Sequence, residues 1–293
     1  MERGGIGYFY LRSHMDQKEL NTERNENGGK RVYPSLFLGH GSPMNAIEEN
    51  EFVDGLRSLS KTIPTPRAIL VISAHWLTNG TYVTAMEHPP TIHDFGGFPK
   101  ALFEVQYPAP GSPSLAKEIQ TLVKSQSVQL DYEWGLDHGT WSVLKHIYPE
   151  ANIPVVQLSM DYKLPLQKHL EIAKELLPLR EQGILIIASG NIVHNLGMVA
   201  WDRLNEIYGF DWAMEVNQNV KEWILKGDIE SLIQIKTKGK KFEWAIPTTE
   251  HYLPLLYTIG TQMESDSISF FNDKPVAGAL TMTSVRLDTH PIK

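Results

Sequence analysis

Short apolar runs alternate with amphipathic stretches from Tyr33 almost to the end of the chain. Several of these runs are apolar throughout rather than at every second position, which is typical of strands that helices cover on both faces. We therefore predict strands at residues 35–39, 68–73, 153–159, 184–188 and 279–285.

Apolar positions recur at helical spacing between the predicted strands. One such stretch starts with Ser112 and Pro113, and a Ser-Pro pair favours the first turn of a helix. We predict helices over residues 113–125, 166–177 and 210–225. Strands that alternate with helices predict an α/β fold, here a single domain with a central, mostly parallel sheet flanked by helices.

Two long stretches lack a regular pattern. Residues 1–31 are rich in Arg, Asn, Glu, Lys and Gly, so we predict a flexible leader there and one folded domain over residues 32–293. Residues 87–110 carry several prolines and glycines, which exclude a long regular element. A loop of this length inside a compact domain is usually functional.

Composition narrows the class of function. The chain has 293 residues and a formal net charge of −7, which leaves no broad basic face for nucleic acid or an anionic membrane. A small molecule is therefore the expected partner. No apolar run reaches the ~20 residues of a membrane span and no signal peptide is recognisable, so we expect a cytoplasmic protein. Because the chain has no cysteine, any metal must be held by His, Asp or Glu.

Three histidines follow predicted strands: His40, His75 and His194. In an open α/β sheet, ligands bind outside the carboxyl ends of the strands, so these imidazoles should point towards one crevice. Glycines on both sides of His40 allow a sharp turn there. Two further candidates are His251, at the expected start of a helix, and His138.

A single histidine is more often a surface or hydrogen-bonded structural residue than a functional one. Because several strand endings should reach the same edge of one sheet, His40 and His75 are the strongest candidate metal ligands. The role of His93 stays open, since its loop could fold over the site. The remaining histidines are expected to have no function in the site: His14, His88, His146, His169 and His290.

Two carboxylates next to candidate histidines have alternative interpretations. Glu250 could complete a set of two histidines and one carboxylate, which leaves positions on iron open, or it could be a helix-start residue that interacts with the helix dipole. Asp137 could orient His138 or cap a turn. The sequence contains no GxSxG elbow, P-loop or GxGxxG motif, so serine hydrolases and nucleotide-binding proteins gain no support.

Five motifs in order resemble one family. They are LGHGSPMN at residues 38–45, ISAHW at 72–76, GLDHGTW at 135–141, SGNIVHNL at 189–196 and EHYLPLLY at 250–257. Together they resemble the class III extradiol dioxygenases of the DOPA 4,5-dioxygenase type, which share their fold with the β subunit of protocatechuate 4,5-dioxygenase. The resemblance covers about residues 36–287, nearly the whole chain after the leader.

The resemblance implies a metal site built from His40 and His75, with His194 and His251 completing its polar lining. The wider class has a carboxylate as the third ligand, whereas the DOPA type has a histidine in this region. The third ligand therefore stays open between His194, Glu250 and His251, and we favour His251.

The resemblance also implies an extradiol ring-opening oxidoreductase over residues 32–293. His194 is then either a ligand or the acid/base, and His138 lies near the substrate as a second catalytic candidate. The expected cofactor is Fe(II), with Zn(II) possible in the purified protein. The expected partners are a catechol and O₂, and the expected assembly is a monomer or a small homo-oligomer.

Two alternatives use the same imidazoles. A zinc-dependent hydrolase would need histidine ligands and an open position for water. A relative that has lost its chemistry would keep the fold and bind only a metal or a ligand. Oxygen consumption distinguishes the dioxygenase from the hydrolase, and turnover of any catechol excludes the non-catalytic relative.

Overall fold

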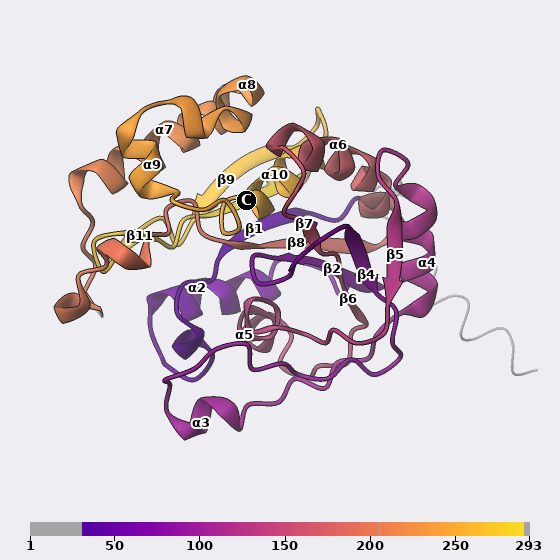
Figure 1. Ribbon diagram of the computed structural model, residues 1–293. Coiled ribbons are helices and arrows are strands. Elements are labelled where there is room, and N and C mark those ends of the chain that lie inside the picture. Colours follow the sequence, from indigo (N-terminus) through magenta and orange to yellow (C-terminus); the bar gives the residue numbers. More distant parts are fainter. Residues whose placement is uncertain (1–30, 205, 290–293) are drawn as a thin grey trace, which may run out of the picture.

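The structure, a computed structural model, describes residues 31–204 and 206–289 (Figure 1). Within these residues the centre of the molecule is a six-stranded sheet. Its four parallel strands pair directly with one another, and the last two are antiparallel to their neighbours. The strand order is β6 (Val155–Gln157), β2 (Ala68–Ser73), β8 (Ile184–Gly190), β1 (Ser35–Gly39), β12 (Ser284–Asp288) and β9 (Ser267–Phe271).

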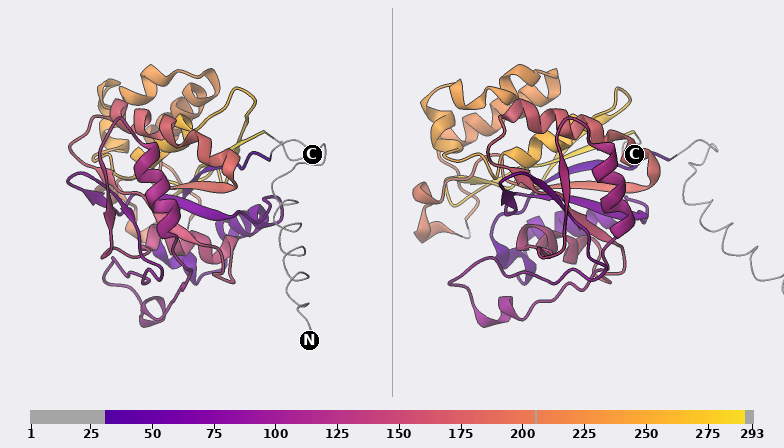
Figure 2. Two further views of the ribbon diagram at one scale, coloured as in Figure 1. Left: turned by 90° about the vertical axis from the view of Figure 1, so that its right-hand side faces the viewer. Right: turned by 45° about the vertical axis from the view of Figure 1, so that its right-hand side comes forward.

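Helices cover both faces of this sheet (Figure 1). One face is covered by α4 (Pro113–Leu122), α6 (Leu166–Leu176), α7 (Asp211–Lys226) and α10 (Leu253–Gly260), and the other by α2 (Glu51–Ser60) and α5 (His138–Ile147). Figure 2 shows the orange helices that follow residue 210 gathered on the side of α6. No helix in the described ranges combines the length and apolar character needed to cross a membrane.

Shorter elements connect these layers. The described residues include α3 (Lys100–Phe103), α8 (Ile229–Ile233), α9 (Lys240–Ala245) and the 3-10 helices η1 (Pro43–Ala46), η2 (Leu177–Gln182), η3 (Leu196–Met198), η4 (Trp201–Arg203) and η5 (Ile235–Thr237). Small two-stranded pairs join β3 (Leu77–Thr78) to β7 (Met160–Asp161), β4 (Thr81–Thr84) to β5 (Val128–Asp131), and β10 (Pro275–Val276) to β11 (Leu280–Thr281).

The sheet separates two apolar cores. In β2, Leu70 and Ile72 belong to the core shared with α6 and α10, whereas Ile69 and Val71 belong to the core shared with α2 and α5. Successive side chains of a strand point to opposite faces, so a strand buried on both faces must be apolar throughout. This explains the unbroken apolar runs of the sequence.

The predicted α/β fold with a mostly parallel central sheet is confirmed. The strands predicted at residues 35–39 and 68–73 have the predicted bounds, and the helices predicted at 113–125, 166–177 and 210–225 correspond to α4, α6 and α7. The predicted leader lies outside the described residues except for Arg31, so the leader and the boundary after it stay predictions.

The single strand predicted over residues 279–285 is wrong. The run divides into β11 and β12, because its backbone groups bond to different partners on either side of Met282. The Thr281 amide donates to the Val193 carbonyl and the Met282 amide donates to the Lys274 carbonyl, whereas β12 pairs with β1. The sequence pattern also missed β9 and α5.

A buried ion pair between Arg180 and Asp266 joins three segments of the chain. The guanidinium of Arg180 binds Asp266 with Nη1 to Oδ2 at 2.6 Å and Nη2 to Oδ1 at 2.8 Å, and neither side chain is exposed. The same guanidinium donates to the carbonyls of Tyr33 and Thr261. Arg180 therefore connects the start of β1 to the end of α10 and to the turn before β9.

The Arg180→Ala variant should lose about 3–5 kcal/mol of unfolding free energy in urea denaturation, because it leaves the buried Asp266 carboxylate without its cationic partner and with only the Met263 amide as a donor. The matched control is Arg203→Ala, since Arg203 forms an exposed pair with Glu206. That control should change stability by less than about 1 kcal/mol. Equal effects of the two substitutions would contradict the prediction.

Candidate metal centre

Parallel strands bring His40 and His75 to one edge of the sheet. The register places Gly39 opposite Gly190 and Ser73 opposite Ser189, so β1, β2 and β8 end at the same level. His40 follows β1 directly, and its amide donates to the Gly190 carbonyl at 3.1 Å. The Nε2 atoms of His40 and His75 lie 3.1 Å apart. The strand-end prediction therefore holds for the placement of these two imidazoles.

His251 joins this pair from the segment before α10. Its carbonyl accepts the Asn191 amide at 2.9 Å, which fixes the segment to the end of β8. The ring centroids lie 5.0 Å apart for His40 and His75, 5.3 Å for His40 and His251, and 5.1 Å for His75 and His251. One nitrogen of each ring lies within 4.8 Å of the others. Three imidazoles at nearly equal spacing form a group that could hold one metal ion.

The second nitrogen of His40 has a partner of its own. His40 Nδ1 lies 3.0 Å from Ser189 Oγ, and that hydroxyl donates to the Gly139 carbonyl at 2.6 Å. Because the hydroxyl proton is already used, Ser189 accepts the Nδ1 proton of His40 and leaves Nε2 with a free lone pair. Gly41 has φ +61°, a left-handed conformation that favours glycine, so the chain can turn away after His40.

The start of α5 brings His138 against His75, with ring centroids 3.8 Å apart. This contact needs glycine at position 139, since a Cβ there would lie 2.5 Å from Ser73 Oγ. Asp137 caps the helix: its carboxylate accepts the Thr140 amide, the Ser73 hydroxyl and the Gln157 amide group. Of the two interpretations of Asp137, the cap is confirmed.

The partner of His138 is Asp94, which the sequence pattern missed. His138 Nδ1 lies 2.9 Å from Asp94 Oδ2, so the interpretation of Asp137 as the orienting carboxylate is wrong. Asp94 belongs to the irregular loop at residues 87–110, which does reach the site. His93, from the same loop, instead places its Nε2 2.9 Å from the Val105 carbonyl. The prediction that this long irregular loop is functional was the one sequence feature that pointed towards Asp94.

His194 lies flat against His251, with ring centroids 3.5 Å apart and 6° between the planes. Glu250 lies behind His251, where its Oε1 is 3.4 Å from His251 Nδ1 and accepts the Thr248 hydroxyl at 2.6 Å. His194, Glu250 and His251 form a second group of possible ligands, which shares His251 with the first, and His75, Asp94 and His138 form a third. All five candidate histidines thus lie together, and Glu250 lies at the margin of the cluster.

Burial lowers the pKa values of the clustered imidazoles. Burial and the neighbouring histidines hold the pKa of His40 well below 6.5 and lower that of His75 to about 2. Burial and His251 lower the pKa of His194 to about 3, and burial also lowers the pKa of His251. These rings are therefore neutral at pH 7, which is the state that a metal ligand or a proton acceptor requires.

The other histidines that the structure describes do not belong to the cluster. His146 Nε2 lies 2.7 Å from the Asn45 carbonyl, and His169 is buried with Nδ1 3.0 Å from the Tyr257 hydroxyl. His88 is exposed. The predictions for His14 and His290 lie outside the described residues.

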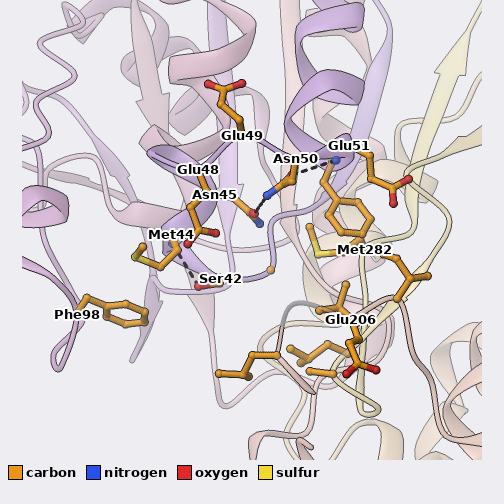
Figure 3. Close-up of a pocket in the computed structure, with 17 residues that line it drawn as sticks. Ser42, Met44, Asn45, Glu48, Glu49, Asn50, Glu51, Phe98, Glu206 and Met282 are labelled. Carbon is orange, nitrogen blue, oxygen red and sulfur yellow. Dashed lines mark hydrogen bonds between the residues drawn. The ribbon is translucent and has the colours of Figure 1, made fainter. Parts of the chain in front are cut away.

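A cavity of about 790 Å³ opens beside the cluster (Figure 3). One wall carries Ser42 and Met44, just after His40, and the other carries Met282 and Leu280. The backbone of Leu280 forms a bridge with that of His194. No histidine of the cluster lines the cavity, so it adjoins the cluster rather than containing it.

Known proteins share this fold and much of this sequence. A solved crystal structure of an uncharacterized protein from Escherichia coli K12 matches with a TM-score of 0.76 and 41% identity, covering 87% of this chain and 99% of that one. The protein named 4,5-DOPA dioxygenase extradiol from Escherichia coli K12 is 47% identical over 87% of this chain and 94% of its own. Its namesake from Beta vulgaris is 35% identical over 87% of this chain and 96% of its own.

A family model covers most of the described residues. Residues 34–278 match the model described as the catalytic LigB subunit of aromatic ring-opening dioxygenase, a range that includes all five clustered histidines and Asp94. The match spans well over half of the chain, and the solved structure with the same fold agrees with it. The chain therefore belongs to the LigB family of aromatic ring-opening dioxygenases.

Proposed function

We propose that the chain is an extradiol dioxygenase that uses O₂ to open the ring of a catechol such as DOPA, with Fe(II) bound by His40, His75 and His251. The observation that carries this proposal is the near-equal spacing of the three rings around one point. Family membership and the names of the relatives support the reaction type.

The donor set fits a non-haem metal. His40 presents a bare Nε2, because its Nδ1 proton is bonded to Ser189, and Glu250 can hold the Nδ1 proton of His251 in the same way. Neutral imidazoles suit Fe(II) and Zn(II) alike, and the chain contains no thiolate that would favour zinc. When bound, Fe(II) held by three imidazoles on one side would supply open positions for a catecholate and O₂.

His251 is the better third ligand, and His194 the better acid/base. The rings of these two histidines are stacked in nearly parallel planes, so their lone pairs do not converge on one ion. His251 is grouped with His40 and His75, whereas His194 and Glu250 are not. We therefore assign His251 to the metal and leave His194 beside it.

The neutral ring of His194 can take the proton of a catechol hydroxyl and return it later in the reaction. His138, on the other side of the cluster, can bind a second polar group of the substrate. The adjoining cavity offers room for a side chain in the para position of the ring. In this assignment the three ligands bind the metal, and the two flanking histidines, His194 and His138, contact the substrate.

His40→Ala, His75→Ala and His251→Ala should each lose most of their bound metal, because each removes one of three ligands. Metal analysis of the folded variants by mass spectrometry measures this loss. His88→Ala is the control, since His88 is exposed and does not belong to the cluster. This variant should bind as much metal as the parent. Near-stoichiometric metal in one of the three variants would remove that residue from the ligand set.

His194→Gln should keep its iron and still bind catechol, because glutamine preserves size and some hydrogen bonding. Its turnover should fall roughly 10²- to 10⁴-fold, the usual contribution of a positioned proton transfer. Metal content and steady-state kinetics, measured on the same preparation, test both parts. If the variant loses iron, His194 is a ligand instead.

Protein loaded with Fe(II) without air should consume oxygen when DOPA or another para-substituted catechol is added. The ring should open outside the two hydroxyls and give a yellow aldehyde product that contains both atoms of O₂. Oxygen uptake on a panel of catechols and mass spectrometry with labelled O₂ provide the measurement. A dicarboxylic product would contradict extradiol cleavage, and hydrolysis of esters or amides without oxygen uptake would favour the zinc hydrolase.

A further inference from the structure

We infer that Asp94 is a positioning residue that sets the proton positions of both His75 and His138, so that each ring presents a bare Nε2 to the site. The kinetic part of this inference rests on the proposed function. The structural part rests on the contacts of one carboxylate that reaches the cluster from the loop at residues 87–110.

The Asp94 carboxylate has three partners, all in the cluster. Its Oδ1 accepts the backbone amide of His138 at 2.8 Å, and its Oδ2 lies 2.9 Å from His138 Nδ1 and 3.4 Å from His75 Nδ1. The side chain is 14% exposed. A carboxylate has about four lone-pair sites and no proton to donate at neutral pH, so it accepts both bonds from His138, while His75 Nδ1 makes an electrostatic contact with it.

These contacts determine the tautomer of His138. A neutral imidazole carries one proton, and a carboxylate acceptor draws that proton to the facing nitrogen. Nδ1 of His138 therefore carries the proton and Nε2 is an acceptor. As an acceptor, Nε2 can take the proton of a substrate hydroxyl into a hydrogen bond, whereas an Nε2 that carried the proton could only donate.

An electrostatic form of this reasoning applies to His75, because a carboxylate oxygen 3.4 Å from Nδ1 favours a proton on that nitrogen. With the proton on Nδ1, His75 Nε2 and His40 Nε2, which lie 3.1 Å apart, both present lone pairs and repel each other unless a cation lies between them. Without Asp94, His75 could move its proton to Nε2 and donate it to His40, which would close the metal site. Asp94 therefore favours the form of His75 that binds metal.

The loop holds Asp94 in place before any ligand binds. The Ile92 amide donates to the Leu136 carbonyl at 2.7 Å, and the buried indole of Trp141 donates to the Ile92 carbonyl at 2.8 Å. Phe95 packs edge-on against the His138 ring at 5.4 Å between centroids. Contacts on both sides of Asp94 thus fix its carboxylate against the start of α5.

The test is Asp94→Asn in the full-length protein. Asparagine keeps an acceptor for the His138 amide but places an N–H donor towards the two Nδ1 atoms, which inverts the preferred tautomers. Competition with a chromophoric chelator should show a zinc affinity lower by about 10- to 100-fold. With saturating Fe(II), kcat and kcat/KM for the catechol should both fall, because His138 loses the acceptor that would bind the substrate hydroxyl.

Long-range proton–nitrogen NMR of the zinc-loaded parent gives a readout that does not depend on turnover. His138 should carry its proton on Nδ1 in the parent and on Nε2 in Asp94→Asn, with its signals assigned through His138→Gln. A proton on Nε2 in the parent would overturn the inference. So would a second equivalent of zinc in the parent that Asp94→Asn loses, because Asp94 would then be a ligand.

Asp131→Asn is the matched control, since Asp131 accepts the amides of Glu133 and Trp134 and contacts no histidine of the cluster. It should retain the zinc affinity and kcat of the parent. An Asp94→Asn variant that matches this control in both measurements would overturn the inference. If the parent itself cleaves no catechol, the proposed function fails, and the zinc and NMR measurements still decide the role of Asp94.

Discussion

The parallel pairing of β1, β8 and β2 is the constraint on which the site depends. Parallel strands in register end at the same edge, so the residues after them must share one small region. His40 enters that region directly from β1, and His75 enters it two residues after β2. A change in the register of one strand by one residue would move its side chains to the other face of the sheet and displace the histidine that follows it.

The cluster has an energetic cost that its surroundings offset. An imidazole nitrogen buried without a partner costs about 1–3 kcal/mol, and several of these rings are nearly excluded from solvent. Ser189, Asp94 and Glu250 each face an Nδ1 atom, so the Nε2 atoms of His40 and His75 are left facing each other at 3.1 Å. A cation bound between these nitrogens would stabilise the folded chain, which would link metal binding to stability.

Two separate parts of the chain enclose the cluster. The irregular loop and the start of α5 supply Asp94 and His138 on one side, and the segments after β8 and before α10 supply His194 and His251 on the other. The edge of the sheet lies between them and holds His40 and His75. His40 and His75, two of the proposed ligands, therefore come from backbone next to the sheet, while the other residues of the cluster come from longer connections.

The sequence by itself determined the four parallel strands of the sheet and the helices α4, α6 and α7, because a strand buried on both faces must be apolar throughout and that pattern is local. It also determined that His40 and His75 lie at the strand ends, and its motifs indicated the family. The tertiary structure alone decided that Asp94 faces His138 across 44 positions, that Asp137 is a cap, and that residues 279–285 divide at Met282. These features depend on hydrogen bonds between distant segments, which leave no period or spacing in the sequence.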